Sequence, residues 1–427
     1  MNKHTLLATT GASPQVVTET LYAIHHENQQ WPDDIYLITT SFGKTKAVEG
    51  LIEDGHLQRL CEELNRPIPK FDATHVLVTP GANGTEVEDA RSLADHEALA
   101  DFIMTEVRNR TASDDTSLHA SLAGGRKTMT FYIGYAMSLF GRAQDTLSHV
   151  LVSEGYEGPN DFFFPTQQSH PVLYRNGPRD GQAVTDSQGT ALDAKNATIT
   201  LAPIPFIRHR RNLPQVLLQN SETVQFAHLV ELINLGENPT AIRLIVDLPA
   251  QILRVQDESG TLRVEIGLGL LELAFYTFMA RATLKGETDW TRPVKDKETK
   301  KDKPDVFLAK VLLEDLLPLC GLSCSDNHND NIKRLGAFNT MQTRFKSDTM
   351  DALSEGIVQN WFDSRKTKIA RTIAEKLPDN LVRWVSPASI WTEDGRRLAD
   401  EDIDKTLKGG GYGLPLRSHQ IQIVEMN

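Results

Sequence analysis

Cysteine is scarce, because the chain of 427 residues contains only 3. So few thiols cannot build the disulfide framework of a secreted domain, and they favour a reducing compartment. We therefore expect a cytoplasmic protein. No apolar run reaches the roughly 20 residues that a membrane-spanning helix needs, and no stretch has the pattern of a secretory signal. The sequence thus predicts no contact with a membrane.

An excess of positive charge is also lacking, since 45 Lys and Arg residues face 57 Asp and Glu residues, for a formal net charge of −12. This balance argues against non-specific coating of nucleic acid, which requires the neutralisation of many phosphates. It leaves room for one small anion pocket. The composition, 40% hydrophobic and 24% charged, is typical of a globular protein, and the length allows two or three domains.

Standard nucleotide-binding and metal-binding motifs are missing as well. A P-loop requires Gly-x-x-x-x-Gly-Lys, and Arg126 separates Gly125 from Lys127 here. Gly11 belongs to no Gly-x-Gly-x-x-Gly run. The spacing C-x3-C-x3-H over residues 320–328 has no fourth ligand with partner spacing, so we expect two buried thiols at a helix end, no metal and no cofactor.

The most informative stretch is Ser-Leu-Ala-Gly-Gly-Arg-Lys-Thr at 121–128. It lies between a predicted strand and the apolar segment 129–140, which is long enough for a buried helix. Two glycines there let backbone N–H groups approach an anion at the positive end of a helix dipole. The stretch therefore suits a phosphate, and the alternative is a tight turn with two solvated basic residues. The candidate ligand residues are Gly124, Gly125, Arg126, Lys127 and Thr128.

A second loop near the N-terminus favours the phosphate interpretation. A predicted strand at 4–9 runs into Thr-Thr-Gly-Ala-Ser-Pro, and a helix is predicted from there to about residue 28. Pro14 suits the first turn of that helix and Ser13 suits its N-cap. In a parallel sheet both loops lie at the carboxyl ends of strands, where such folds bind ligands. The candidate residues of this loop are Thr9, Thr10, Gly11, Ala12 and Ser13.

Strands and helices are predicted to alternate over the first 152 residues, which indicates an α/β fold with a Rossmann-like parallel sheet. The expected strands are 4–9, 35–40, 74–79, 116–121 and 147–152, and the expected helices are 14–29, 44–65, 90–110 and 127–141. The turn-rich loop 79–84 is expected at the same edge as the two glycine loops. Residues 153–210 are expected to add short antiparallel strands, one of them at 198–201.

A basic connector near 205–214 divides the chain into two predicted domains, 1–205 and 212–427. The second domain is expected to be mostly helical α+β, with a charged mobile loop near 291–305. Its predicted strands are 242–246 and 262–266, and its predicted helices are 226–235, 270–281, 306–318, 331–360 and 364–377. A hairpin between 388–391 and 419–424, with a turn at 409–411, would give it the outline of a winged helix.

The two glycine loops resemble those of the CARF proteins, the CRISPR-associated Rossmann-fold sensors of type III systems. The matching residues are Thr-Thr-Gly-Ala-Ser-Pro at 9–14 and Gly-Gly-Arg-Lys-Thr at 124–128. The runs 131–135 and 162–166 make the chain most similar to ring nucleases with a helical or winged-helix second half. The resemblance covers about residues 1–165.

The resemblance implies a homodimer with a cyclic oligoadenylate bound across its two-fold axis, and symmetry favours an even-numbered ring such as cyclic tetra-adenylate. It also implies metal-independent cleavage, in which a ribose 2′-OH attacks the neighbouring phosphate and leaves a 2′,3′-cyclic phosphate. Lys127 is then expected to stabilise charge in the transition state. Ser13, supported by Thr10, would orient the ribose.

Two other functions stay open at this stage. A ribonuclease effector of the HEPN type needs Arg-x4–6-His, and two such pairs, Arg91 with His96 and Arg142 with His149, occur in the first half. A ligand-gated transcription regulator would use a basic stripe on a DNA-reading helix. Such a stripe repeats every third residue, at Arg365, Lys368 and Arg371.

Overall fold

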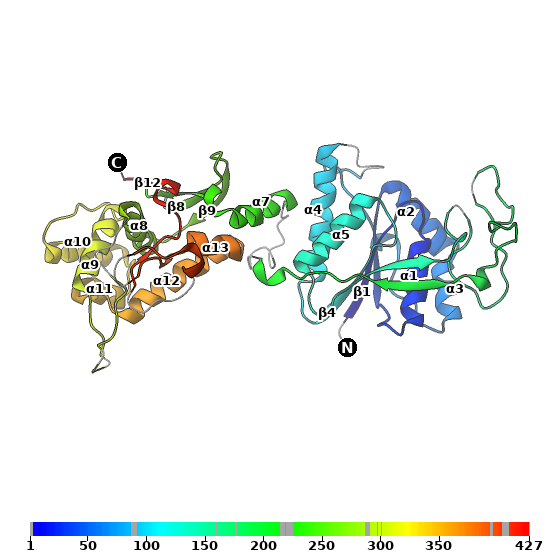
Figure 1. The fold of residues 1–427 in the computed structure, drawn as a ribbon, viewed down its shortest axis with the longest axis horizontal. Coiled ribbons are helices and arrows are strands. Elements are labelled where there is room, and N and C mark those ends of the chain that lie inside the picture. The colour runs from blue at the N-terminus through cyan, green and yellow to red at the C-terminus, as the bar shows by residue number, and fades with distance from the viewer. Residues whose placement is uncertain are drawn as a thin grey trace. The chain divides into compact units, whose positions relative to one another are not determined.

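The computed structural model describes residues 3–86, 92–158, 160–175, 177–213, 218, 225–286, 291–296, 298–299, 301–392, 396–403 and 410–426. Arg91, Gly409 and two lysines of the charged loop, Lys297 and Lys300, lie outside these residues. The chain forms two compact units (Figure 1). The first is Met1–Arg211 with Leu218–Ala227, and the second is Asn212–Leu217 with His228–Asn427.

The first unit is built on a six-stranded sheet with the order β3-β2-β1-β4-β5-β6. Its strands are β1 Lys3–Thr9, β2 Asp34–Thr39, β3 Val76–Val78, β4 Thr116–Ser121, β5 Thr146–Val152 and β6 Ile199–Pro203. All neighbours pair in parallel except β6, which is antiparallel to β5. The Rossmann-like sheet predicted from the sequence is confirmed. The chain runs outward in both directions from the central β1–β4 pair, which makes this pair the switch point of the sheet.

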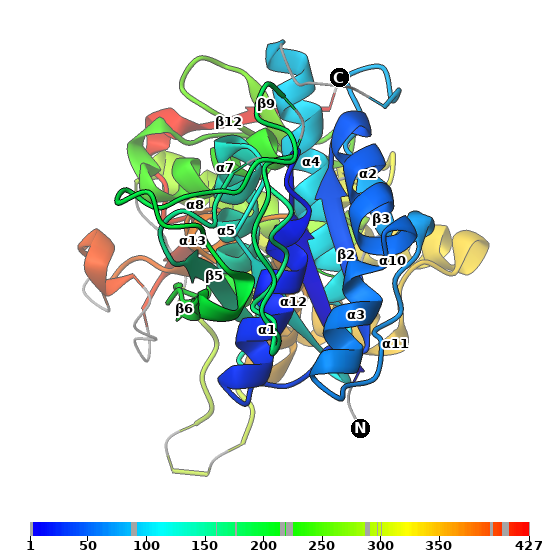
Figure 2. The same ribbon diagram turned by 90° about the vertical axis from the view of Figure 1, so that its right-hand side faces the viewer.

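Helices cover both faces of this sheet, with α4 and α5 on one side and α1, α2 and α3 on the other (Figures 1 and 2). They are α1 Gln15–His26, α2 Ser41–Ala47, α3 His56–Glu63, α4 Leu93–Arg110 and α5 Lys127–Phe140, with a π-helix at Val48–Glu53. The single helix predicted over 44–65 is wrong. Gly55 has a left-handed φ of 70°, so the helical path cannot continue through it.

The burial pattern explains why the central strands have continuous runs of apolar residues in their sequences. Leu6 and Ala8 of β1 pack on one side against Val17 and Leu21 of α1. Leu7, between them in the sequence, points to the other face and is also fully buried. Because both faces are covered, no position of the strand needs a polar side chain.

The second unit contains a smaller sheet of four strands with the order β12-β7-β8-β9. The strands are β7 Arg243–Asp247, β8 Ile252–Gln256, β9 Leu262–Gly267 and β12 Ile421–Val424, and a separate pair joins β10 Ala388–Ser389 to β11 Tyr412–Gly413. The helices are α7 Phe226–Glu237, α8 Leu270–Lys285, α9 Val306–Leu319, α10 His328–Gln342, α11 Ser347–Glu355, α12 Gln359–Ala374 and α13 Asp379–Val385. Short 3₁₀ turns lie in this unit at Pro239–Ala241, Asp400–Asp402 and Ser418–Gln420, in the first unit at Ala73–His75 and Ala194–Asn196, and at the boundary at Arg210–Asn212.

The predicted C-terminal hairpin is wrong. Strand β12 pairs in parallel with β7, from Ile421 beside Leu244 to Val424 beside Asp247, and not with residues 388–391. The long helix predicted over 331–360 is also wrong, because Thr343 and Gly356, with φ of 50° and 116°, end α10 and α11. The second unit is therefore helical with a small mixed sheet, and in its described residues the partner of Ala388–Ser389 is Tyr412–Gly413.

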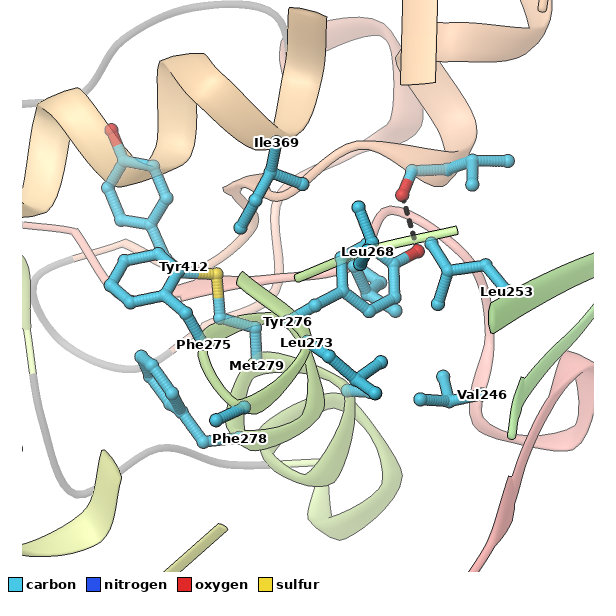
Figure 3. Packing of buried hydrophobic residues seen from close by; sticks show 14 of the residues in the cluster. Val246, Leu253, Leu268, Leu273, Phe275, Tyr276, Phe278, Met279, Ile369 and Tyr412 are labelled. Carbon is cyan, nitrogen blue, oxygen red and sulfur yellow. Dashed lines mark hydrogen bonds between the residues drawn. The ribbon is translucent and has the colours of Figure 1, made fainter. Parts of the chain in front are cut away.

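Helix α8 forms the centre of the second unit (Figure 3). Most of its residues are buried, including Phe275, Tyr276 and Phe278. The Tyr276 hydroxyl donates a hydrogen bond of 2.6 Å to the carbonyl oxygen of Val385. A helix that is apolar on most of its faces has to be buried over most of its length, and only its last turn, with Leu284 and Lys285, is exposed here. Within the described residues, no helix combines the length and the hydropathy needed to cross a membrane.

Candidate functional site

The two glycine loops touch each other at the carboxyl ends of β1 and β4. These strands are direct neighbours, with Ala8 beside Ser121. The hydroxyl of Thr9 donates a hydrogen bond of 2.6 Å to the carbonyl oxygen of Gly124. The structure therefore brings the two predicted loops into one surface at the switch point of the sheet, where open α/β sheets bind their ligands.

Both glycines of the second loop are required by this contact. Gly125 has a φ of 89°, and a Cβ atom on it would lie 3.0 Å from the Cβ of Thr9. A Cβ atom on Gly124 would lie 2.9 Å from the carbonyl oxygen of Thr9. Gly11 differs, because a Cβ atom there would meet nothing within 4 Å. The packing of the protein itself thus does not demand a glycine at position 11, and the space beside it is open.

Hydrogen bonds from threonine hydroxyl groups hold the backbone of the first loop in place. Thr10 is fully buried and its hydroxyl donates to the carbonyl oxygen of Ser13 at 2.7 Å. The hydroxyl of Thr39 donates to the carbonyl oxygen of Thr10 at 2.8 Å. Ser13 and Ala12 are exposed at the tip of the loop. The predicted N-cap role of Ser13 is wrong, because the cap position of α1 is Pro14 and no side chain caps the helix.

The second loop presents its charges at the start of α5. Arg126 is the N-cap residue, Lys127 is the first helical residue, and both are exposed. No side chain caps this helix, and the first backbone bond back to the cap comes from the N–H of Thr130. Thr128 is half-buried. The N–H groups of the first turn and the charge of Lys127 thus face a possible anion, and Arg126 adds a second positive charge beside them.

A third loop, Thr39–Gly43, belongs to the same edge and was missed at the level of sequence. It follows β2, and a Cβ atom on Gly43 would lie 2.7 Å from the carbonyl oxygen of Gly11. The loop after β3 begins beside it, because the N–H of Thr79 donates to the carbonyl oxygen of Thr39 at 2.9 Å. A pair of threonines at the end of a strand, beginning at Thr9 and again at Thr39, is the signal that could have identified it.

A cavity of about 670 Å³ opens beside the first loop, with Ala12 and Pro14 in its wall. The ring of His56 stacks on Phe163 with 3.5 Å between the ring centroids, and its Nδ1 accepts a hydrogen bond of 2.8 Å from Arg59. Burial, together with the nearby positive charges, lowers the pKa of His56 to about 4. This histidine is therefore neutral at physiological pH, and no sequence motif pointed to it.

Helix α1 also carries a carboxyl group that changes charge near neutral pH. Burial, reinforced by Glu157, raises the pKa of Glu19 to about 7. The same helix contacts the segment after β5, where the hydroxyl of Thr18 donates to the carbonyl oxygen of Phe163 at 2.7 Å. Perturbed carboxyl groups of this kind are enriched at functional sites, although structural burial also produces them.

The residues of the two other candidate functions are engaged elsewhere in the described part of the chain. The guanidinium of Arg142 is buried against Asp145, with Nη2–Oδ1 at 2.8 Å and Nε–Oδ2 at 2.9 Å. Two of the three stripe residues, Arg365 and Lys368, both donate to Glu272. The three stripe residues do lie on one helix, α12, as their spacing predicted.

No group of three or more His, Cys, Asp or Glu side chains is placed to share a metal ion within the described ranges. All three cysteines are free. Cys61 is buried, whereas Cys324 is exposed, with its sulfur 3.7 Å from the carbonyl oxygen of Glu314. The prediction of two buried thiols at this helix end is wrong, because Cys320 is half-buried and Cys324 is exposed.

A Rossmann-like sheet with glycine loops and an uncapped helix at its switch point defines the class: an α/β protein with an edge suited to a phosphate-bearing ligand. The chain belongs to the family of CRISPR-associated protein NE0113, whose profile matches residues 13–235, just over half of its length. The match includes the second glycine loop and most of the first unit.

Comparisons with individual proteins add little to this family assignment. No curated protein matches the sequence. Among solved structures, a candidate UDP-N-acetylglucosamine 2-epimerase from Listeria monocytogenes aligns at 13% identity over 35% of this chain, with a TM-score of 0.20. The alignment spans 31% of that protein's chain. At this level of similarity it carries no conclusion on fold or activity.

Proposed function

We propose that this CRISPR-associated protein binds a cyclic oligoadenylate, most simply cyclic tetra-adenylate, and cleaves it without a metal ion. The proposal rests mainly on the contact between the two glycine loops at the β1–β4 switch point. Backbone N–H groups, Arg126 and Lys127 converge there on one edge of the sheet. This arrangement suits a phosphodiester. The same loops resemble those of CARF proteins, and this resemblance is our reason for proposing a cyclic oligoadenylate as the ligand.

The proposed chemistry assigns a separate task to each loop. A ribose 2′-OH attacks the neighbouring phosphorus, the bond to the 5′ oxygen breaks, and the products carry a 2′,3′-cyclic phosphate and a 5′-OH. Negative charge develops on the phosphoryl oxygens, and Lys127 stabilises it. Gly124, Gly125 and Arg126 hold the phosphate, while exposed Ser13, on a loop tied down by Thr10, orients the ribose.

The proposal is tested by incubating the purified full chain with radiolabelled cyclic tri-, tetra- and hexa-adenylate and resolving the products. We expect cleavage of the tetra-adenylate to linear fragments ending in 2′,3′-cyclic phosphate, at the same rate with and without EDTA. The rate is insensitive to chelation because the attack needs only a positioned ribose and fixed cations. Loss of cleavage on chelation, restored by magnesium, would overturn the mechanism. Binding without cleavage would make the protein a sensor.

We also propose that the protein acts as a homodimer through the first unit, so that one ring contacts two copies of each loop. The sequence predicted a buried helix from the apolar segment 129–140, which lies in α5. Much of that apolar character is used inside the unit, since Ile133, Ala136 and Met137 are buried. Phe131 remains, 61% exposed, with Tyr135 beside it. This aromatic surface is our candidate for the dimer contact.

The dimer is tested by light scattering on the full chain at micromolar concentration. We expect twice the mass of one chain, and Phe131→Glu should shift it to a monomer because a charge would be buried in the contact. Met341→Glu in α10 is the matched control, since Met341 is 80% exposed in the second unit. A parental protein that is monomeric with saturating cyclic tetra-adenylate would rule out the two-fold arrangement.

A further inference from the structure

The second unit contains a cavity of about 490 Å³ that none of the functions above uses. Its wall combines the start of α8, the connection between α10 and α11, and the middle of α12. The volume falls within the usual range of small-molecule sites, about 300–1,000 Å³. The lining residues that bear on its chemistry are Leu270, Glu272, Arg344, Phe345, Lys346, Arg365 and Lys368.

The charge of this wall is strongly positive, in contrast to the acidic chain as a whole. Four cationic side chains line the cavity against a single carboxylate, so that three positive charges are in excess. The carboxylate is Glu272, which is 6% exposed. Its Oε1 accepts hydrogen bonds from Lys368 at 2.7 Å and from Arg365 at 3.3 Å. The carboxylate of Glu272 thus already neutralises part of the positive charge that lines the cavity.

Two helices begin at this cavity without a side-chain cap. Helix α8 starts after Gly269 and α11 starts after Lys346, and neither cap residue makes a side-chain hydrogen bond. In α11 the N–H of Thr349 already donates to the carbonyl oxygen of Lys346 at 3.1 Å, and both helix dipoles present their positive ends at the start of the helix. Helix α8 has 16 residues and α11 has 9.

Arg365 supplies an independent sign that a ligand belongs here. Its Nε is buried and has no hydrogen-bond partner among the described residues, although Nη1 of the same guanidinium contacts Glu272. The guanidinium carbon lies 5.2 Å from the centroid of the Trp361 ring. A buried donor without an acceptor is costly, so the guanidinium of Arg365 still has capacity for a further acceptor.

We propose that this cavity binds a nucleoside diphosphate. Two phosphates, with about three negative charges at neutral pH, match the excess of positive charge and the two helix starts. The half-buried Phe345 and Leu270 offer an apolar wall for the base. This site is separate from the glycine loops of the first unit, and it does not depend on the function proposed for them.

The test is isothermal titration of the full chain with adenosine 5′-diphosphate. Arg365→Gln should weaken binding at least about tenfold, the usual effect of losing a hydrogen bond to a charged group. Lys346→Gln, at an exposed position, should weaken it in the same direction without affecting folding. Glu272→Gln should tighten it, because the competing carboxylate is gone. Lys127→Ala should have no effect.

Arg371→Gln is the matched control, because Arg371 is exposed on the same helix but does not line the cavity. Its affinity for the diphosphate should equal that of the parental chain. The absence of binding up to millimolar diphosphate would overturn the proposal. So would equal losses in Arg365→Gln and Arg371→Gln. Tight binding of a 12-nucleotide RNA that needs Arg371 would identify a nucleic-acid face instead.

Discussion

Replacing Lys127 by alanine is expected to slow cleavage of cyclic tetra-adenylate by about 100- to 1000-fold, or roughly 3–4 kcal/mol. Lys127 is the first residue of α5 and is exposed beside two glycines whose backbone is fixed by Thr9. If it stabilises charge that develops mainly in the transition state, its loss affects the rate more than the affinity. Binding should weaken less, because Arg126 and the N–H groups of the first turn still hold the phosphate.

Single-turnover cleavage beside a direct binding titration separates these two quantities. Ser13→Ala should show a smaller loss of rate, because it removes orientation and leaves the charge in place. Lys70→Ala is the control, since Lys70 is an exposed lysine whose backbone joins β2 near its amino end, away from the loops. A parental rate in Lys127→Ala would refute the assigned role. Simultaneous loss of binding and cleavage would make Lys127 an anchor only.

Replacing Asp145 by alanine is expected to destabilise the first unit by about 3–5 kcal/mol. Asp145 is fully buried and forms a two-point contact with Arg142. Its Oδ1 also accepts a hydrogen bond of 2.9 Å from the N–H of Leu118 in β4. Removal of the carboxylate would leave a buried guanidinium and a strand N–H without their acceptor, and both losses act in the same direction.

Urea unfolding, combined with hydrogen exchange of peptides from β4 and β5, measures this effect and locates it. Protection should fall in these strands and should be unchanged in α8 of the second unit. Asp115→Ala is the control, because Asp115 is an exposed carboxylate in the turn before β4. If Asp145→Ala unfolds at the same urea concentration as the parental chain, the pair contributes nothing net to stability.

The fold of the first unit could be predicted from the sequence almost completely. Its strands are short apolar runs and its helices follow glycine- or serine-bearing loops, so local pattern and global fold agree. The segment 44–65 was the exception. Gly55 adopts a left-handed conformation there, and one glycine within a helical pattern does not reveal its φ.

For the second unit, the sequence predicted individual helices and strands, with some errors, but not how the strands pair. Strand β8 and helix α13 were missed, and β12 was assigned the wrong partner. Pairing between residues near 244 and near 421 joins segments far apart in the chain. Each segment fits several neighbours, so only the packing of the whole core selects one.

The candidate site, too, could be predicted from the sequence only in part. By itself, the sequence determined that two loops with glycines and hydroxyls follow strands of a parallel sheet, because strand, loop and helix signals are local. Only the tertiary structure decided that Thr9 donates a hydrogen bond to Gly124 and that the segment Thr39–Gly43 lies beside the first loop. It also decided that Arg365 and Lys368 donate hydrogen bonds to Glu272. These contacts depend on strand order and on which helix covers which core, and such long-range choices leave no periodic signal in the chain.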